Sequence, residues 1–136
     1  YALYRLAVAC DDARPLTLAD AWLTRIERDI ELPAAFASPG EGLDRDGVGP
    51  VSPFHSVTGV HFTRALLALG MNDPHGAARA VEHFAMASQV PWHKPDLTLG
   101  RAGVPLASAQ LIEALPQSMS AQATRLRTSP FFEPVK

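Results

Sequence analysis

Two apolar segments of this chain begin alike and stay in register, and this repeat limits the possible folds more than any other feature. Gly59-Val60 is matched by Gly103-Val104 at a spacing of 44 residues (59 to 103). The match continues with Ala65 opposite Ala109 and with Leu67 opposite Leu111. One helical hairpin fits that period, and tandem helical hairpins bury their apolar faces only against neighbouring hairpins. We therefore expect an all-α fold of tandem helical hairpins, either an open solenoid or a closed ring, and we favour part of an α/α toroid (α/α barrel).

Apolar periodicity and helix-end residues predict six helices and no strand. The expected helices cover residues 2–13, 16–32, 56–69, 74–88, 104–115 and 118–127. The two repeated segments, 56–69 and 104–115, are apolar on nearly every side, which is typical of buried helices. The helix at 74–88, with Asp73 as its N-cap and Pro74 in its first turn, is amphipathic, as expected for an outer ring.

The helix at 16–32 is also amphipathic. The residues expected on its buried side are Ala19, Trp22, Leu23, Ile26 and Ile30. Thr17 with Asp20 forms a weak capping box, which predicts that the helix begins there. Cys10 lies on the apolar side of the preceding helix and is expected to be a small buried residue. Ser118 is the expected cap of the last helix.

The connection at 33–55 is rich in proline and glycine and predicts an irregular loop that is long for a compact domain. Glycines also mark the helix starts, at Gly59, Gly100 and Gly103. In a double ring the inner helices crowd together at their starts, where a glycine allows backbones to approach closely. The alternative, that Gly100 and Gly103 only form the turn before a helix, stays open, and both readings are compatible.

Charge and cysteine content exclude several classes of protein. The formal net charge is −2 and no run of lysine or arginine occurs, so we expect no nucleic-acid partner. A single cysteine allows no internal disulfide, which fits a reducing, cytoplasmic location. No apolar stretch approaches the roughly 18 residues that span a bilayer, so no membrane association is expected. The chain begins at Tyr1 inside an expected helix, which suggests a fragment of a longer protein.

Two motifs resemble a known family. Residues 96–104, DLTLGRAGV, resemble the D-x-x-x-G-x-x-G-[IV] signature of the lanthionine synthetase C-like (LanC-like) domain. Residues 55–60, HSVTGV, resemble a weaker copy of the H-x-x-x-G-[IV] start of its repeats. The segment from 50 to 116 is similar to the version fused behind serine/threonine kinase-like domains in bacteria. On this resemblance, residues 1–136 form a partial LanC-like α/α-toroid domain.

The resemblance implies a specific chemistry. Complete active members are zinc-dependent peptide cyclases in lanthipeptide biosynthesis, which add a cysteine thiolate to a dehydrated serine or threonine to form a thioether ring. Zinc lowers the pKa of the thiol, and an acid/base group manages the proton of the resulting enolate. The family's aspartate matches Asp96, which is the one catalytic candidate. A peptide substrate and an N-terminal kinase-like domain are the implied partners.

Other readings of the same residues stay open. Asp96, after Pro95 and ahead of a helix, is also typical of a turn residue that binds backbone N–H groups. The two cysteines and the histidine of the family's zinc site have no match here, so no metal-ligating or cofactor-binding residue is assigned. His61 interrupts an apolar helix and either faces a cavity or is a hydrogen-bonded core histidine. Arg64, one turn later, either lines that cavity or forms a salt bridge within the bundle.

Three hypotheses follow. The first is a fragment of a LanC-like cyclase that is inactive alone because zinc ligands would follow Lys136. The second is a noncatalytic α-helical repeat module that binds a peptide or a kinase domain. The third, another α/α-toroid enzyme such as a glycosidase, ranks last because Asp96 has no evident carboxylate partner. An incomplete ring should also expose apolar faces and self-associate.

Overall fold

The computed structural model of this chain describes residues 1–30, 32, 35–36 and 49–128. This part of the chain is all helical: six α-helices and one short 3-10 helix, with no strand. The elements are α1 (Ala2–Cys10), α2 (Arg14–Asp29), α3 (Val57–Gly70), α4 (Pro74–Ser88), α5 (Gly103–Ala114), the 3-10 helix η2 (Gln117–Met119) and α6 (Ser120–Arg127). The prediction of an all-α fold is confirmed. Most of the predicted loop at 33–55 and the segment after Thr128 lie outside the described residues.

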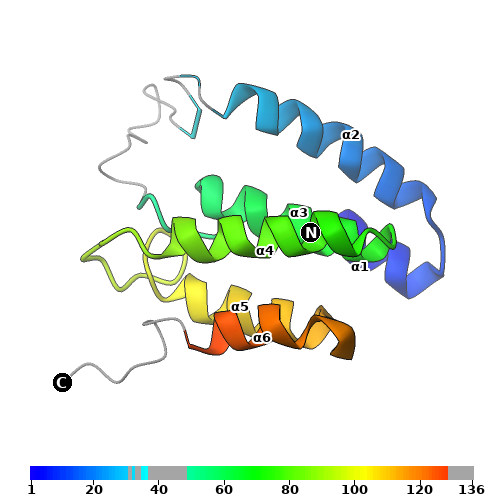
Figure 1. Ribbon diagram of the computed structural model, residues 1–136. Coiled ribbons are helices and arrows are strands. Elements are labelled where there is room, and N and C mark those ends of the chain that lie inside the picture. Colours follow the sequence, from blue (N-terminus) through cyan, green and yellow to red (C-terminus); the bar gives the residue numbers. More distant parts are fainter. Residues whose placement is uncertain (31, 33–34, 37–48, 129–136) are drawn as a thin grey trace.

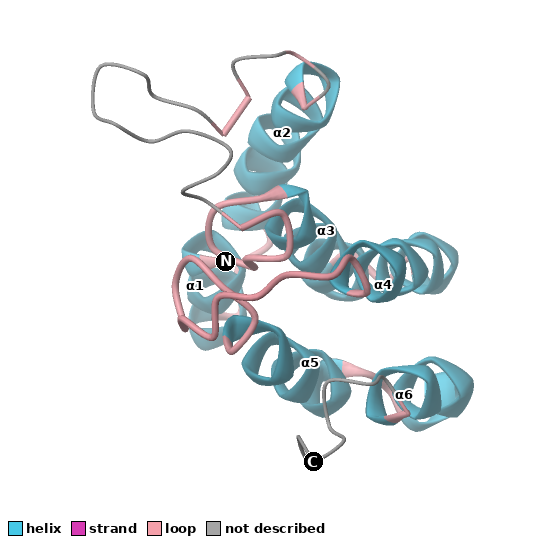
Figure 2. Ribbon diagram, turned by 90° about the vertical axis from the view of Figure 1, so that its left-hand side faces the viewer, coloured by secondary structure: helices cyan, strands magenta, loops and turns pink. Residues whose placement is uncertain are grey.

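The helices follow one another as three pairs, α1–α2, α3–α4 and α5–α6. The α3–α4 pair lies in the middle, with α2 on one side and α5 with α6 on the other (Figure 1). Viewed from the end, α1 lies next to α3, α2 projects to one side of the α3–α4 pair, and α6 lies on the other side of that pair, where it contacts α4 (Figure 2). The repeated helices α3 and α5 contact each other directly. The described part is thus a stack of helical hairpins.

The predicted N-cap of α4 is confirmed, and α3 has an N-cap at Ser56 that was not predicted. Ser56 is the N-cap of α3, and its side chain accepts a hydrogen bond from the Thr58 N–H. Asp73 is the N-cap of α4, where its carboxylate accepts from the Gly76 N–H at 2.8 Å, and Pro74 occupies the first turn. The side-chain acceptors satisfy N–H groups that have no partner within the helix. The central hairpin is therefore fixed at both starts by local sequence.

Apolar side chains from α3, α4 and α5 build the main core. Its members include Phe62, Leu66, Val81, Phe84 and Leu111, each buried almost completely. A second, smaller cluster joins α1 and α2 to the opposite side of α3. Because α3 contributes to both clusters, it is the most enclosed helix, as its apolar sequence predicts.

Two predicted helix starts are wrong. The helix α2 begins at Arg14 with Pro15 in its first turn, and its N-cap, Ala13, makes no side-chain bond. Thr17 and Asp20 therefore lie inside the helix and form no capping box, because Pro15 already supplies a backbone angle suited to the first turn. At the C-terminus, Ser118 belongs to the 3-10 helix, and α6 begins at Ser120.

The predicted buried side of α2 is wrong in part. Ala19 and Leu23 are buried against α1 and α3, but Trp22 is 64% exposed and Ile26 is 41% exposed. The helix is rotated so that a polar stripe faces α3 at its C-terminal half, which turns Trp22 and Ile26 outward. Cys10 is also exposed rather than buried, because it is the last residue of α1.

The glycines at the helix starts do allow close backbone approach, but the approaching backbone belongs to loops. A Cβ on Gly59 would overlap the carbonyl oxygen of Pro53. A Cβ on Gly103 would lie 2.6 Å from the Leu97 carbonyl oxygen and 2.9 Å from Pro53 Cδ. Gly100 is crowded in the same way by the backbone at Lys94 and Asp96. Gly59 and Gly103 thus share Pro53 as a neighbour, and α3 and α5 start at the same end of the bundle.

Candidate functional site

Asp96 lies in the loop before α5 and is exposed. Its Oδ1 atom accepts hydrogen bonds from the N–H groups of Thr98 at 2.7 Å and Leu99 at 2.6 Å. This is the geometry of an aspartate that closes a turn on itself. Asp96, the catalytic candidate, therefore stabilises a turn. It does not line the cleft described below.

The loop that holds Asp96 is tied to the segment before α3. The Ser52 hydroxyl, fully buried, donates to the Thr98 carbonyl and accepts from the Phe54 and His55 N–H groups at 3.2 Å. The Gly49 N–H donates to the Leu99 carbonyl at 2.9 Å. These bonds hold the two helix-start loops together, so the two family-like motifs lie side by side in space.

A cleft of about 610 Å³ opens between α2, α3 and α4. From α2 it is lined by Asp20 and Glu27, and from α3 by His61 and Arg64. The opposite wall is formed by α4 and the residues at its start: Met71, Asp73, Gly76, Arg79, Ala80 and His83. Groups of both charges and two imidazoles therefore face one concave space.

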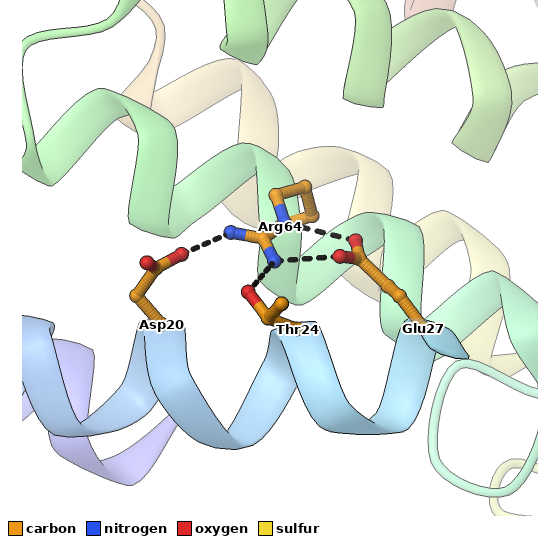
Figure 3. Close-up of polar contacts among 4 residues, drawn as sticks. All are labelled: Asp20, Thr24, Glu27 and Arg64. Carbon is orange, nitrogen blue, oxygen red and sulfur yellow. Dashed lines mark hydrogen bonds and ion pairs between the residues drawn. The ribbon is translucent and has the colours of Figure 1, made fainter. Parts of the chain in front are cut away.

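Arg64 organises the α2 wall of this cleft. Its guanidinium reaches across from α3 to three side chains on successive turns of α2 (Figure 3). Glu27 accepts two bonds, from Nε at 2.8 Å and from NH2 at 2.6 Å, and Asp20 accepts from NH1. Thr24 accepts a longer bond of 3.3 Å from NH2. Arg64 therefore takes the second of its two expected roles, a salt bridge within the bundle, while also lining the cleft.

These contacts stabilise the charged guanidinium of Arg64. The hydrogen bond to Glu27 raises the pKa of the guanidinium above its usual value, burial opposes this, and the bond to Asp20 raises the pKa further. The two-oxygen contact with Glu27 is the geometry in which arginine binds carboxylates most strongly. The network fixes the position of α2 on α3 at the rim of the cleft.

His61 faces the cleft, where its ring contacts that of His83 on α4. The ring centroids lie 5.2 Å apart in an edge-on arrangement. Burial lowers the pKa of His61 below its usual value, His83 lowers it further, and Glu27 partly opposes the change. His61 is half-buried, so the cavity-facing reading describes it better than the core reading.

The described residues do not fit a metal centre. No group of three or more histidine, cysteine, aspartate or glutamate side chains within the described part of the chain could hold a metal ion. We therefore assign no zinc ligand to these residues.

Sequence reasoning missed three residues of the cleft. Asp20 is predicted only as part of a capping box, and no role is predicted for Glu27 or His83. The spacing of Asp20, Thr24 and Glu27, at i, i+4 and i+7, was the available signal, because it puts three polar groups on one helix face. The partly buried Arg64 on the neighbouring helix was needed to show which face is turned inward.

Comparisons with known proteins leave the chain without a relative from which to transfer a role. No family model matches it, no curated protein matches it, and no solved structure matches it. Among the helices of the described residues, none is both long enough and apolar enough to cross a bilayer.

Proposed function

We propose that this chain is part of a LanC-like α/α-toroid domain and supplies three of its helical hairpins, together with the motif-bearing loops before α3 and α5. The observation that carries the proposal is the shared packing of Gly59 and Gly103 against Pro53. It supports a repeat in three dimensions, because the residues that match in sequence also start neighbouring helices at one end of the bundle. The Ser52–Thr98 bond, which joins the two motif-bearing loops, supports the same reading.

On this proposal the complete protein is a peptide cyclase. Zinc, when bound, would activate the thiol of the substrate cysteine, and its ligands would have to come from residues outside this sequence. Within this chain, Asp96 is the candidate that holds or moves a proton near the start of α5. Its Oδ1 accepts hydrogen bonds from two backbone N–H groups, so proton transfer by Asp96 would have to be compatible with the turn that these bonds close.

The test uses the complete product of the encoding gene, loaded with zinc, and a peptide that contains one cysteine and one dehydroalanine. Cyclisation removes the free thiol while the mass stays constant, so labelling with iodoacetamide followed by mass spectrometry reports it. We expect cyclisation by the complete product and none by residues 1–136 alone. A complete product that holds zinc but leaves the thiol free would overturn the cyclase assignment.

Asp96→Asn separates the two roles of Asp96. Asparagine keeps a side-chain oxygen that can accept from Thr98 and Leu99 but lacks the carboxylate. Loss of cyclisation with unchanged thermal stability supports a proton-transfer role. Unchanged cyclisation leaves Asp96 as a turn residue only.

A second candidate function is a noncatalytic module that binds a peptide. It is favoured by the turn geometry of Asp96 and by the cleft, which presents charges of both signs and apolar surface to one ligand. The same peptide distinguishes the two functions: binding without loss of the thiol, weakened at least about tenfold by Arg79→Glu, supports the module. Docking to a kinase-like domain remains a further proposal for the same module.

A further inference from the structure

The side of α2 that faces away from the bundle carries an apolar stripe. Leu18, Trp22 and Ile26 follow one another at intervals of four residues and are 51%, 64% and 41% exposed. Side chains at that spacing lie on one helix face. Three large apolar side chains in one row expose a contiguous apolar patch, and such patches are found at interaction sites more often than singly exposed apolar residues are.

A groove continues this stripe beyond the end of α2. It has a volume of about 390 Å³ and is lined by Trp22, Arg25, Ile26, Asp29, Ile30, Leu32, Ala35 and Phe36. Most of that lining is apolar, and the two charged residues in it have opposite signs. Arg25 and Asp29 are both exposed and stand one turn apart on the face that carries Trp22. The surface therefore combines apolar area with a charge pattern that can complement itself.

We propose that this surface pairs two copies of the chain through antiparallel α2 helices related by a two-fold axis. In an antiparallel pair centred level with Glu27, the axis places Arg25 of each copy opposite Asp29 of the other. Two-fold symmetry makes this contact twice, which is the condition for a self-complementary interface. In the same register, Trp22 of each copy lies just past the C-terminal end of the partner's α2, on the side where the partner's groove continues.

The size of the surface sets the expected strength. One helix face with a short groove is smaller than the interfaces of stable complexes, so the dimer is expected to be weak and to dissociate on dilution. Its specificity comes from the Arg25–Asp29 contacts, since like charges placed opposite each other oppose the pairing. This proposal does not depend on the cyclase or the peptide-binding function.

Sedimentation velocity on residues 1–136 over a dilution series tests the proposal. We expect a reversible monomer–dimer equilibrium. Arg25→Glu makes both positions negative and Asp29→Arg makes both positive, so each variant alone should bind itself at least about tenfold more weakly. An equimolar mixture of the two variants should dimerise again, and so should the double variant R25E/D29R. Circular dichroism verifies that each variant remains helical.

Tryptophan fluorescence tests the location of the contact. The chain has two tryptophans, so Trp92→Phe leaves Trp22 as the only reporter. Its emission should shift to shorter wavelength as the dimer forms, and the shift should disappear in R25E. A monomer at every concentration overturns the proposal. A dimer that ignores the charge changes, or that leaves Trp22 emission constant, overturns it as well.

Discussion

The two interfaces on either side of α3 differ in the kinds of side chain that form them. Toward α4 and α5, α3 packs apolar side chains such as Phe62 and Leu66 into the main core. Toward α2, a small apolar cluster near Leu23 gives way to the ion pairs of Arg64 with Asp20 and Glu27. The first interface is centred on fully buried side chains such as Phe84, whereas the second is held at the rim of the cleft by partly exposed ion pairs. We infer that α4 is part of the permanent core and that α2 is the more easily displaced element.

The sharpest test of this difference is truncation of the core on the α4 side. Phe84 is fully buried and its ring lies 6.3 Å from that of Phe62. Phe84→Ala should lower the free energy of unfolding by about 3–5 kcal/mol, because it removes buried apolar area and leaves a cavity. Urea denaturation measures the change. Met86→Ala, on the exposed side of the same helix, should change stability by less than about 0.5 kcal/mol.

A methyl group added at the start of α3 tests the rigidity of the same central region. In Gly59→Ala the new Cβ meets the Pro53 carbonyl, which is backbone and cannot rotate away. We expect a loss of about 1–3 kcal/mol. Gly70→Ala in the same helix is the matched control, because its Cβ would meet only side-chain atoms of Leu16 and Tyr4 at 3.3 Å. There the gain in helix propensity offsets the crowding, so equal losses at the two glycines would contradict the assignment.

Removing the arginine tests the polar interface. Arg64→Met deletes the bonds to Glu27 and Asp20 and should lower stability by about 1 kcal/mol, since the site is partly screened by solvent. A double-mutant cycle with Glu27→Gln isolates the pair. Arg125→Met removes the exposed contact with Glu82 at 3.4 Å and should cost less than about 0.5 kcal/mol. A loss as large as that of Phe84→Ala would break the distinction between the two interfaces.

Acidification should produce the smallest effect, confined to the cleft. Because the pKa of His61 is lowered in the folded protein, the unfolded chain binds the proton more tightly. The stability that the neutral ring provides is complete above about pH 6.5 and is lost as the pH falls through the folded pKa. The melting temperature should therefore fall between pH 7 and pH 5, and His61→Asn should reduce that slope. His75→Gln, outside the cleft, should leave it unchanged; equal slopes in all three proteins would remove His61 from the explanation.

Local sequence predicted the central part of the molecule well. The cap at Asp73, the apolar character of α3 and the common start of α3 and α5 all depend on neighbouring residues or on a direct repeat. These signals are strong because each helix end satisfies its own N–H groups within a few residues. The all-α class followed from them, whereas the toroid stays a proposal.

The orientation of α2 could not be read from its sequence. Two faces of this helix could pack against α3, one with Trp22 and Ile26 and one with Asp20 and Glu27. Apolar periodicity alone selects the first face, but Arg64 on α3 reverses that choice over the C-terminal half of the helix. Ion pairing of this kind depends on a residue 37 positions away, which no local pattern reports. The same rotation explains why the cleft residues were missed.

The hydroxyl of Ser52 also constrains the order of events during folding. Its bond to Thr98 closes a loop of 46 residues that contains the whole α3–α4 hairpin. Closing so long a segment is entropically unfavourable while it is disordered, and the formation of the hairpin from short-range contacts shortens the distance to be bridged. We therefore expect the Ser52–Thr98 bond to form late, after the central hairpin. We expect α5 to pack against α3 at the same stage. The amide of Gly49, which bonds to Leu99, should gain protection from hydrogen exchange later in refolding than the amides of α3.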